Sequence, residues 1–433
     1  MDLAPLPGFR DFFPDRAARR EYLFARWRET ARRFGFEPYD GPPLESVELY
    51  RRKSGEEIVG QLYAFTDKGG REVALRPEMT PTLARMIGTQ GASQPKPIKW
   101  FSMPQLFRYE RQQRGRLREH FQFNCDILGE ASIEADVELV ALLVETLASF
   151  GLTARDFSVK VSDRLLLVAV LEALGIADGA ARAQVFAAVD KLSREPREKV
   201  REKLVASGLA ARTTDDLLEL LAAHDLSRLA SRFETAPQVA ERVLTLQRFF
   251  GLLECMGLGG FAEFDPTIVR GLDYYTGIVF EAFDREGKLR AISGGGRYDD
   301  LLENLGGTPL PALGFGMGDV VLGEMLTERN LWPAKPEGGL QIYLVLVEEA
   351  LRPKMLALGH TLRRAGFRVD YSLATLAVGK QFRAAAQRHA AVAIVLGPEE
   401  WLRGAVKLKD LASREEREVS VAELEKALAS LPS

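Results

Sequence analysis

Strict alternation of apolar and polar side chains over residues 121–127 constrains the fold of this chain more than any other feature of its sequence. The apolar positions are Phe121, Phe123, Cys125 and Ile127, and the polar positions are Gln122, Asn124 and Asp126. Because successive side chains of a β-strand point to opposite faces, this pattern predicts a half-buried strand. Its polar face carries two carboxamides and a carboxylate.

A hairpin is predicted just before this strand. Residues 106–110 suit a second short strand, and the polar, glycine-containing run 111–116 suits the connecting loop. If the strands pair, Arg108 lies on the same surface as Gln122 and Asp126. Such groups need partners when they are removed from water. A ligand with both a cation and an anion would supply them, although a surface hairpin with solvated charges fits the pattern equally well.

Two segments resemble a known family. The run F-R-Y-E-R at 107–111, the arginine-rich loop, and a glutamine and an aspartate four residues apart resemble motif 2 of the class II aminoacyl-tRNA synthetases. Within that class, the pair Gln122 and Asp126 is similar to the histidyl-tRNA synthetases. The sequence R-G-L-D-Y-Y-T at 270–276 is close to a signature of the same family and is the most specific match in the chain.

The resemblance implies an α+β catalytic domain built on a mixed, mostly antiparallel sheet with helices, of the class II synthetase type. Residues 165–260 are rich in Ala, Leu, Glu and Arg at helical spacing, which predicts a helical insertion. After residues 332–339, strands alternate with helices, which predicts a small C-terminal α/β domain with a largely parallel sheet. The expected domains are the first part of the catalytic domain with motifs 1 and 2 at 1–164, the helical insertion at 165–260, the second part with motif 3 at 261–331, a linker at 332–339, and an anticodon-binding domain at 340–433.

An amphipathic helix is predicted near the N-terminus, ending at Gly35. Its apolar stripe is Leu23, Trp27, Ala31 and Phe34. The prolines of residues 36–45 exclude a helix there and leave a loop, an edge strand or an interface element. The helix and the following P-P-L-E sequence resemble class II motif 1, which forms the dimer interface in that family. The resemblance therefore implies a homodimer.

The implied function is that of a histidine–tRNA ligase. Histidine attacks the α-phosphate of ATP to give histidyl-adenylate and pyrophosphate, and the histidyl group then passes to the 3′-terminal adenosine of tRNA(His). Activation of this kind is an in-line displacement at phosphorus, so the protein chiefly positions the reactants and neutralises charge. Arg108 and Arg270 are the expected catalytic residues, on opposite sides of the α-phosphate, because a permanently charged fork suits this task.

By the same resemblance, histidine binding is assigned to Glu78, Met79, Thr80, Arg108, Gln122, Asp126, Arg270, Tyr274 and Tyr275. An imidazole donates a hydrogen bond from one nitrogen and accepts one at the other, which matches a carboxylate paired with a phenol hydroxyl. Asp126 with Tyr274 or Tyr275 is therefore expected to read the side chain of the substrate.

Residues 75–82 contain two prolines and are predicted to be irregular, which leaves Glu78 and Thr80 to project from a loop. In the family, an acidic residue and a threonine at these places hold the α-ammonium group of the substrate. Capping of a following helix by Thr80 or Thr82 fits the sequence as well.

ATP binding is assigned by the resemblance to Arg108, Glu110, Arg116, His120 and Arg297. His120 stands where the common bacterial pattern has a phenylalanine that stacks on adenine, and an imidazole can also stack. Three glycines at 294–296 suit the floor of a ligand site, although a tight bend would need them too. Mg²⁺ is expected to accompany ATP, without a dedicated carboxylate cage.

Residues 314–319 and the apolar helix after them match motif 3. The family usually ends this motif in Glu-Arg, with the arginine contacting ATP, but the matching residues here are Val320 and Val321. Either Arg114, Arg116 or Arg297 substitutes for the missing arginine, or ATP is held differently.

Composition excludes several other classes of site. Lysine and arginine total 58 and the acidic residues 61, so the net charge of -3 gives no global attraction to nucleic acid. Two distant cysteines and four scattered histidines indicate neither a disulfide framework nor a structural metal site. No signal pattern or membrane-spanning apolar run occurs, so a cytoplasmic protein without membrane contact is expected.

Two rival functions share some of these features. A synthetase-like regulatory subunit of ATP phosphoribosyltransferase in histidine biosynthesis would share much of the fold, and the departure in motif 3 favours it. The complete-looking residues 340–433 and the intact 270–276 signature speak against it. A non-catalytic RNA-binding or scaffold protein would use the C-terminal domain alone.

Overall fold

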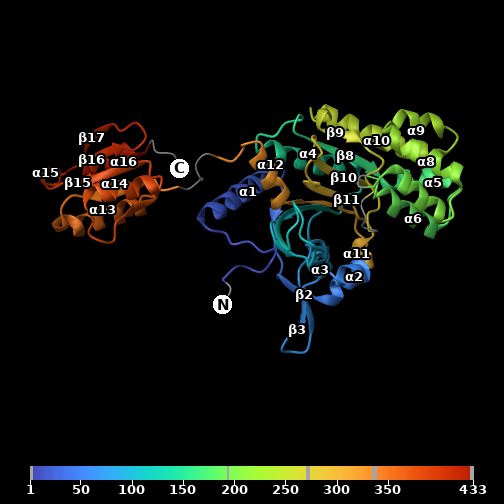
Figure 1. The fold of residues 1–433 in the computed structure, drawn as a ribbon, viewed down its shortest axis with the longest axis horizontal. Coiled ribbons are helices and arrows are strands. Elements are labelled where there is room, and N and C mark those ends of the chain that lie inside the picture. The colour runs from blue at the N-terminus through green and yellow to red at the C-terminus, as the bar shows by residue number, and fades with distance from the viewer. Residues whose placement is uncertain (1–2, 193–194, 270–273, 334–338, 430–433) are drawn as a thin grey trace. The chain divides into compact units, whose positions relative to one another are not determined.

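The computed structural model of the chain describes residues 3–192, 195–269, 274–333 and 339–429 (Figure 1). Contacts between Cα atoms divide the chain into two compact units. One comprises Met1–Phe13 with Leu23–Trp332, and the other comprises Pro14–Tyr22 with Pro333–Ser433. Most of the expected linker, residues 334–338, lies outside the described residues. The boundaries expected for the catalytic, helical and C-terminal domains remain predictions.

The first unit is built on a mixed, mostly antiparallel sheet, as the resemblance implied. Its strands are β1 (Glu37–Pro38), β5 (Ile98–Ser102), β6 (Gln105–Phe107), β7 (Glu119–Leu128), β8 (Phe157–Asp163), β9 (Ala262–Phe264), β10 (Ile278–Asp284), β11 (Ser293–Arg297) and β12 (Ala312–Gly318). Their order is β1-β5-β7-β12-β11-β10-β8-β9, with β6 paired to β7. The β1–β5 and β8–β9 pairs are parallel and the others antiparallel.

Strand β7 is an interior strand of this sheet, between β5 and β12, and its burial differs from the prediction. Both faces are enclosed: Phe123 is fully buried on one, while Asn124 and Asp126 are only 7% and 4% exposed on the other. Phe123 stacks on Trp27 with ring centroids 5.5 Å apart. The predicted strand is confirmed, but the prediction of a half-buried strand was wrong. Neighbouring segments cover the polar face and supply hydrogen bonds to it, which the alternation alone cannot reveal.

Helices pack against this sheet and against one another (Figure 1). Helix α4 contacts β7 and β12, α10 contacts α4, and α12 contacts β7 and β12. Their bounds, with those of the N-terminal helix, are α1 (Pro14–Arg33), α4 (Ile133–Ala148), α10 (Pro237–Cys255) and α12 (Asp319–Glu328). Gly35 has a positive φ of 76° just after α1, which confirms it as the residue that turns the chain out of the predicted helix.

A small antiparallel sheet of order β2-β4-β3 precedes motif 2. Its elements and the short helices beside it are β2 (Leu44–Ser46), α2 (Val47–Val59), β3 (Ala64–Thr66), β4 (Glu72–Leu75), α3 (Thr80–Gln90), η1 (Gly91–Ser93) and α11 (Leu301–Asn304). The β3–β4 turn is closed by the Asp67 carboxylate, which accepts hydrogen bonds from the amides of Gly69 and Arg71 at 2.8 and 2.9 Å.

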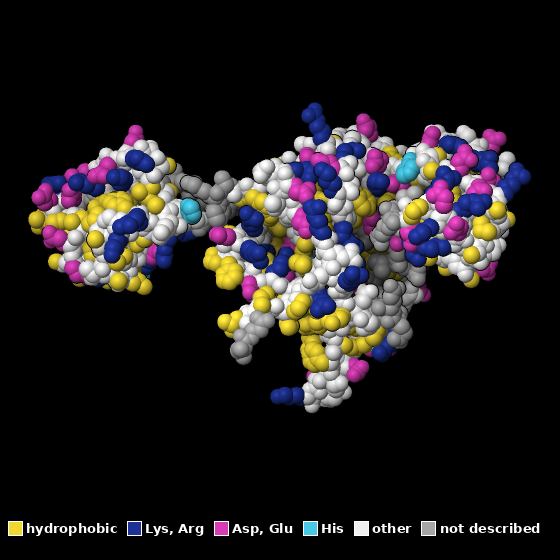
Figure 2. Space-filling view, viewed as in Figure 1, with side chains coloured by type: hydrophobic (Ala, Val, Ile, Leu, Met, Phe, Trp, Pro, Cys, Tyr) yellow, Lys and Arg dark blue, Asp and Glu magenta, His cyan; other side chains and the backbone are white. Residues whose placement is uncertain are grey.

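The predicted helical segment is confirmed between the strands β8 and β9. Besides α10, its elements are α5 (Arg164–Ala173), α6 (Gly179–Val189), α7 (Arg197–Ala206), α8 (Ala211–Ala223), α9 (Leu226–Arg232) and η2 (Gly259–Phe261). The segment has its own apolar core, which includes Leu171, Val185, Val200 and Leu217. Figure 2 shows acidic and basic side chains interspersed over these helices. The mixture of both signs favours the interpretation that this surface is simply solvated, and it speaks against an RNA-binding site on these helices.

The second unit contains a five-stranded sheet among its described residues, of order β14-β13-β15-β16-β17. Its elements are β13 (Ile342–Leu346), η3 (Glu349–Leu351), α13 (Arg352–Arg364), β14 (Val369–Tyr371), α14 (Val378–Gln387), β15 (Val392–Leu396), α15 (Pro398–Leu402), β16 (Ala405–Asp410), β17 (Glu416–Ser420), η4 (Val421–Glu423) and α16 (Leu424–Leu428). Strands β14, β13 and β15 are parallel, as predicted, but β16 and β17 join them antiparallel. The sheet is therefore mixed: α15 lies between β15 and β16, and a short turn connects β16 to β17.

Across both units, none of the described helices is long and apolar enough to cross a membrane.

Candidate active site

A cavity of about 290 Å³ is formed by strands β7, β10, β11 and β12, the loop between β6 and β7, and the start of α12. Five residues that were expected to bind substrates line it, namely Arg108, Glu110, Arg116, His120 and Gln122. Gly294 and Gly316 lie on adjacent strands in the same wall. Segments more than 150 residues apart in the sequence thus enclose one polar site.

Glycines of β12 let the polar side chains of β7 lie across the neighbouring strand. A Cβ on Gly316 would lie 2.7 Å from the side-chain carboxamide carbon of Gln122, and one on Gly314 would overlap the Asp126 carboxylate. Because no side chain fits there, the motif 3 strand must carry glycine at both positions. The alternating glycines of residues 314–318 were a signal of this close packing in the sequence.

Arg108 is held at the edge of the cavity by its own backbone and by the preceding segment. Its amide donates to the Arg118 carbonyl at 3.0 Å, which closes the predicted hairpin. Its Nε donates to the Pro77 carbonyl at 2.9 Å. Arg108 and Gln122 both line the cavity, as expected from their predicted positions. Because Glu78 directly follows Pro77 in the chain, this bond also holds the backbone just before Glu78 against Arg108.

The segment after Pro77 differs from the predicted loop. Helix α3 begins at Thr80, so this threonine lies in the first turn of a helix. Neither threonine caps it: Met79 is the N-cap without a side-chain bond, and Thr82 instead donates to Glu45 at 3.1 Å. Glu78 is 9% exposed and Met79 1%. The roles assigned to Glu78, Met79 and Thr80 in histidine binding remain predictions.

Asp126 has a phenol partner, Tyr298, that the sequence analysis did not assign, and the roles of Tyr274 and Tyr275 in binding the imidazole remain predictions. The Tyr298 hydroxyl donates a hydrogen bond to the Asp126 carboxylate. Burial raises the pKa of Tyr298 well above its ordinary value, and the nearby Asp126 raises it further, so the hydroxyl stays protonated. Tyr274 packs edge-on against Tyr298 with ring centroids 5.9 Å apart, and its hydroxyl donates to that of Tyr275 at 3.4 Å.

His120 is neutral in this cavity. Burial, together with the positive charges of Arg108, Arg10 and Arg116, lowers the pKa of the imidazole to about 3. An uncharged imidazole among arginines offers a flat face without adding a repelling charge. This state fits the expected stacking on a base, which remains a prediction.

Known proteins resemble this chain over almost its whole length. The family model for histidyl-tRNA synthetase matches residues 8–318, and that for an anticodon binding domain matches residues 341–431. The histidine–tRNA ligase of Opitutus terrae is 48% identical over 420 residues, which are 96% of this chain and 95% of the relative. This chain belongs to the histidyl-tRNA synthetase family.

Further relatives of this synthetase extend over plants and bacteria. The chloroplastic/mitochondrial histidine–tRNA ligase of Arabidopsis thaliana is 40% identical over 98% of this chain and 86% of its own. The crystal structure of histidyl-tRNA synthetase from Nostoc sp. PCC 7120 superposes with a TM-score of 0.84 over 99% of both chains at 24% identity, which shows a shared fold. These matches agree with the expected class II synthetase architecture.

Arg297, which the resemblance assigned to ATP binding, is not among the residues that line the cavity. Its guanidinium bonds the buried Asp136 carboxylate of α4 and also donates to the carbonyls of Glu130 and Ser132 at 3.1 and 3.2 Å. Its side chain is only 9% exposed. Arg297 and Gly294 are three residues apart on β11 and so point to opposite faces of the sheet. These contacts join β11 to α4 and give Arg297 a structural role, so they lend no support to its assignment to ATP, which remains a prediction.

The loop of motif 2 presents its other arginines differently. Arg116 pairs with Glu110, and both line the cavity. Arg114 bonds Glu324 and Glu328 of α12 and is 62% exposed, so it anchors the loop to the helix. Val320 and Val321 line the cavity beside this loop. Of the three arginines considered as substitutes for motif 3, only Arg116 faces the cavity.

A network of charged side chains next to the cavity was not predicted from the sequence. Arg10 donates to Glu119 at 2.6 Å and to Asp319 at 2.8 Å, and Asp319 also accepts from the Phe121 amide at 2.9 Å. Gln105 donates to Glu119 at 2.9 Å. Burial raises the pKa of Asp319, and the charge of Arg10 opposes this shift. The network ties the N-terminal segment, β7 and α12 together, and no local sequence signal marks it.

Arg270, the second expected catalytic residue, lies in residues 270–273 and outside the described part of the chain. Its position opposite Arg108 therefore remains a prediction. Among the described residues, no group of three or more His, Cys, Asp or Glu side chains is placed to hold a metal ion.

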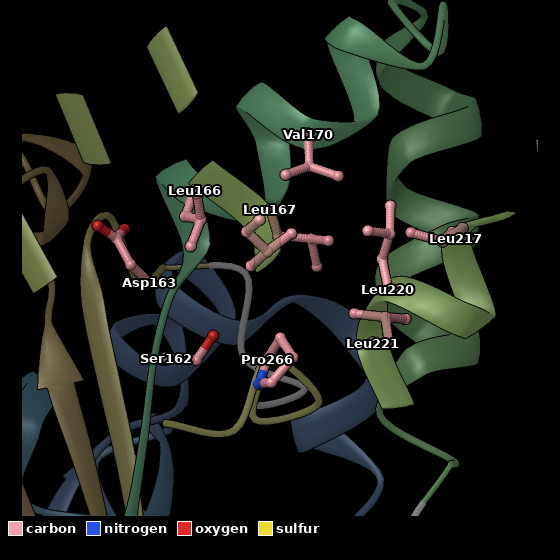
Figure 3. A pocket seen from close by; sticks show the side chains of 10 residues that line it. Ser162, Asp163, Leu166, Leu167, Val170, Leu217, Leu220, Leu221 and Pro266 are labelled. Atoms are coloured by element: carbon pink, nitrogen blue, oxygen red, sulfur yellow. The ribbon is translucent and has the colours of Figure 1, made fainter. Parts of the chain in front are cut away.

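A second, smaller cavity lies where the helical segment meets strand β8. It has a volume of about 20 Å³ and is lined almost wholly by apolar side chains of α5 and α8, with Pro266 (Figure 3). Figure 3 shows the Asp163 carboxylate directed away from the leucines. This carboxylate pairs with Arg242 and caps α5 through the Leu165 amide at 2.8 Å. A cavity of this size and lining is a packing gap with room for about one water molecule.

Proposed function

We propose that this chain is a histidine–tRNA ligase that activates L-histidine with ATP and transfers the histidyl group to the 3′-terminal adenosine of tRNA(His). The observation that carries the proposal is its likeness, over nearly the full length of both chains, to proteins named histidine–tRNA ligase. The polar cavity with Arg108 and Gln122 on one wall supports it.

The first step requires that histidine and ATP meet with their negative charges compensated. In the proposed site, Arg108 binds the α-phosphate, and its bond to the Pro77 carbonyl fixes the direction of the guanidinium. Such preorganised donors stabilise the charge that develops at phosphorus without further rearrangement. Arg270 approaches from the other side and steadies the histidine carboxylate; its assignment rests on the signature at 270–276 alone.

The histidine side chain is read by Asp126 in this proposal. Tyr298 donates to the carboxylate and so orients it, while Tyr274 packs against both Tyr298 and Tyr275. A buried pocket that satisfies both imidazole nitrogens rejects analogues that lack them, because polar groups would be left unpaired. Gln122, Glu78 and Thr80 hold the α-ammonium group.

ATP lies between Arg108 and the loop of motif 2, with the base against His120. Arg116 and Glu110 line this part of the cavity as an ion pair. Mg²⁺ accompanies the nucleotide and is held mostly by the phosphates, which is how this ion usually binds in nucleotide sites. Among the described residues that line the cavity, the carboxylates are those of Glu110 and Glu281.

The second unit binds the anticodon of tRNA(His), and the motif 1 region, which includes α1 and β1, forms a homodimer. The match of residues 341–431 to an anticodon binding domain supports the first statement. The resemblance to motif 1 supports the second. A cytoplasmic location is part of the proposal and rests on the absence of a signal pattern in the sequence, while the Arabidopsis thaliana relative is named chloroplastic/mitochondrial.

The rival functions have less support. A structure named as an ATP phosphoribosyltransferase regulatory subunit/histidyl-tRNA synthetase from Bacillus halodurans also superposes, with a TM-score of 0.75, but at 21% identity the likeness extends only to the fold. The relatives at 40–48% identity are ligases. A scaffold that uses only the second unit would not need a polar cavity in the first.

Histidine-dependent exchange of pyrophosphate into ATP tests the proposal. The purified full-length chain should catalyse exchange with L-histidine and should be silent with the other amino acids. Charging of a tRNA(His) transcript should then occur under the same conditions. If histidine gives no exchange above the background without amino acid, the ligase assignment fails.

A further inference from the structure

The described cavity contains an arginine that none of the sequence motifs discussed above includes. Arg290 lies in the connection between β10 and β11, is half-buried, and lines the same cavity as Arg108 and Arg116. We propose that Arg290 binds the outer phosphates of ATP and takes the place of the arginine that motif 3 lacks. The proposal rests on the ligase function given above.

The position of Arg290 carries the argument. A Cβ built on Gly115 would lie 3.3 Å from Val321 Cγ2 and 3.5 Å from Arg290 Cδ, so both side chains reach the same point beside the loop of motif 2. Val321 is the residue that matches the usual motif 3 arginine. Arg290 therefore brings a guanidinium from β10–β11 to the neighbourhood that this arginine would reach from α12.

The negative charge of bound ATP calls for a further cationic side chain in the cavity. Its described lining contains the carboxylates of Glu110 and Glu281 and the guanidinium groups of Arg108, Arg116 and Arg290. Arg116 is paired with Glu110, and Arg108 is assigned to the α-phosphate. Besides Mg²⁺, the outer phosphates have no cationic side chain assigned to them, and a planar fork with several donors is suited to them.

The backbone around Arg290 is fixed, which directs its side chain. The buried Asp284 carboxylate accepts from the amides of Lys288 and Leu289 at 3.0 and 2.9 Å. On the other side, the Ile292 amide donates to the Ala282 carbonyl at 2.8 Å. The Arg290 Nη1 itself lies 3.4 Å from the Gln113 side-chain oxygen, a weak bond that ATP can replace. The arginine is thus held at the rim of the cavity before the nucleotide arrives.

The test compares the affinities for ATP and AMP of full-length variants by titration calorimetry with Mg²⁺ present. Arg290→Ala should weaken ATP binding about 10- to 100-fold, because it removes hydrogen bonds between charged groups. AMP, which lacks the outer phosphates, should bind with unchanged affinity. Arg290→Lys should retain part of the ATP affinity. Lys288→Ala removes a charge from the same hairpin, outside the cavity lining, and should leave both affinities unchanged.

Two further readouts separate a specific role from a structural one. In the exchange assay, Arg290→Ala should raise KM for ATP and leave KM for histidine unchanged. Adding Val321→Arg to this variant should restore ATP affinity, because it returns the cation from α12. Equal losses for ATP and AMP, unchanged ATP affinity, or a folded double variant without restoration would each overturn the proposal. Absence of exchange in the unsubstituted chain would instead overturn the ligase function, since ATP binding is measured separately.

Discussion

Replacing Tyr298 by phenylalanine tests how the proposed histidine pocket is built. The hydroxyl donates to the Asp126 carboxylate, and the two residues are 3% and 4% exposed. Phenylalanine keeps the ring and its edge-on packing against Tyr274, so the change removes one hydrogen bond and little else. The carboxylate stays buried and loses a donor that fixes its direction.

The expected magnitude follows from this geometry. A hydrogen bond to a charged group contributes about 1.5–3 kcal/mol, and the free energy of unfolding should fall by about this amount. If Asp126 reads the imidazole, its loss of orientation should also weaken histidine binding. At about 1.4 kcal/mol for each factor of ten, complete transfer of this energy to the substrate would raise KM for histidine about 10- to 150-fold. KM for ATP should change little.

Urea denaturation and the pyrophosphate exchange assay measure the two effects on the same protein. Tyr343→Phe is a matched control, because Tyr343 is a buried tyrosine on β13 of the second unit, 2% exposed. It should leave both KM values unchanged. A Tyr298→Phe variant of unaltered stability would refute the hydrogen bond. Equal increases in KM for histidine and for ATP would refute the assignment of Asp126 to the imidazole.

Three other predictions follow from the described contacts. Arg297→Gln should lower the free energy of unfolding by about 3–5 kcal/mol, because it leaves the Asp136 carboxylate buried without its cation; urea denaturation measures this, and a large selective change in KM for ATP would argue for the original assignment. His120 has a pKa of about 3 in the folded chain, below its ordinary value, so its neutral form contributes stability that is complete above pH 6.5 and is lost as the pH falls towards 3. The Tm of the unsubstituted chain relative to His120→Phe should therefore fall between pH 7 and pH 5, and a constant difference would show that the imidazole is not buried. Deleting residues 333–433 should spare exchange but weaken tRNA charging; equal loss of both would show that the second unit is needed for activation.

The sequence and the structure agree most closely where the constraint is local. Alternation over residues 121–127 predicted β7, and the glycine-containing run before it predicted the hairpin loop. Helical periodicity predicted the helices between β8 and β9. These features depend only on how often apolar side chains recur along one segment, and that spacing can be read directly from the sequence.

The errors arose where one residue type fits two structures. The prolines at 77 and 81 were interpreted as a loop, but Pro81 lies in the first turn of α3, where its missing amide costs no helical hydrogen bond. The hydrogen bond from Tyr298, in the segment after β11, to Asp126 was not predicted, because no local pattern marks a tyrosine that pairs with a distant strand. From the sequence alone, an arginine in a turn, such as Arg290, cannot be distinguished from an arginine that is simply solvated at the surface.

By itself, the sequence determined the strand that carries Gln122 and Asp126, the helical segment between β8 and β9, and the family that the chain resembles. Only the tertiary structure decided which groups meet in the cavity. Strand parity places Arg297 and Gly294 on opposite faces, but only the packing of α4 on one of those faces turned Arg297 into a buried anchor. The physical reason is that periodicity fixes the direction of a side chain within its own element, whereas its partner depends on which distant elements pack against that face.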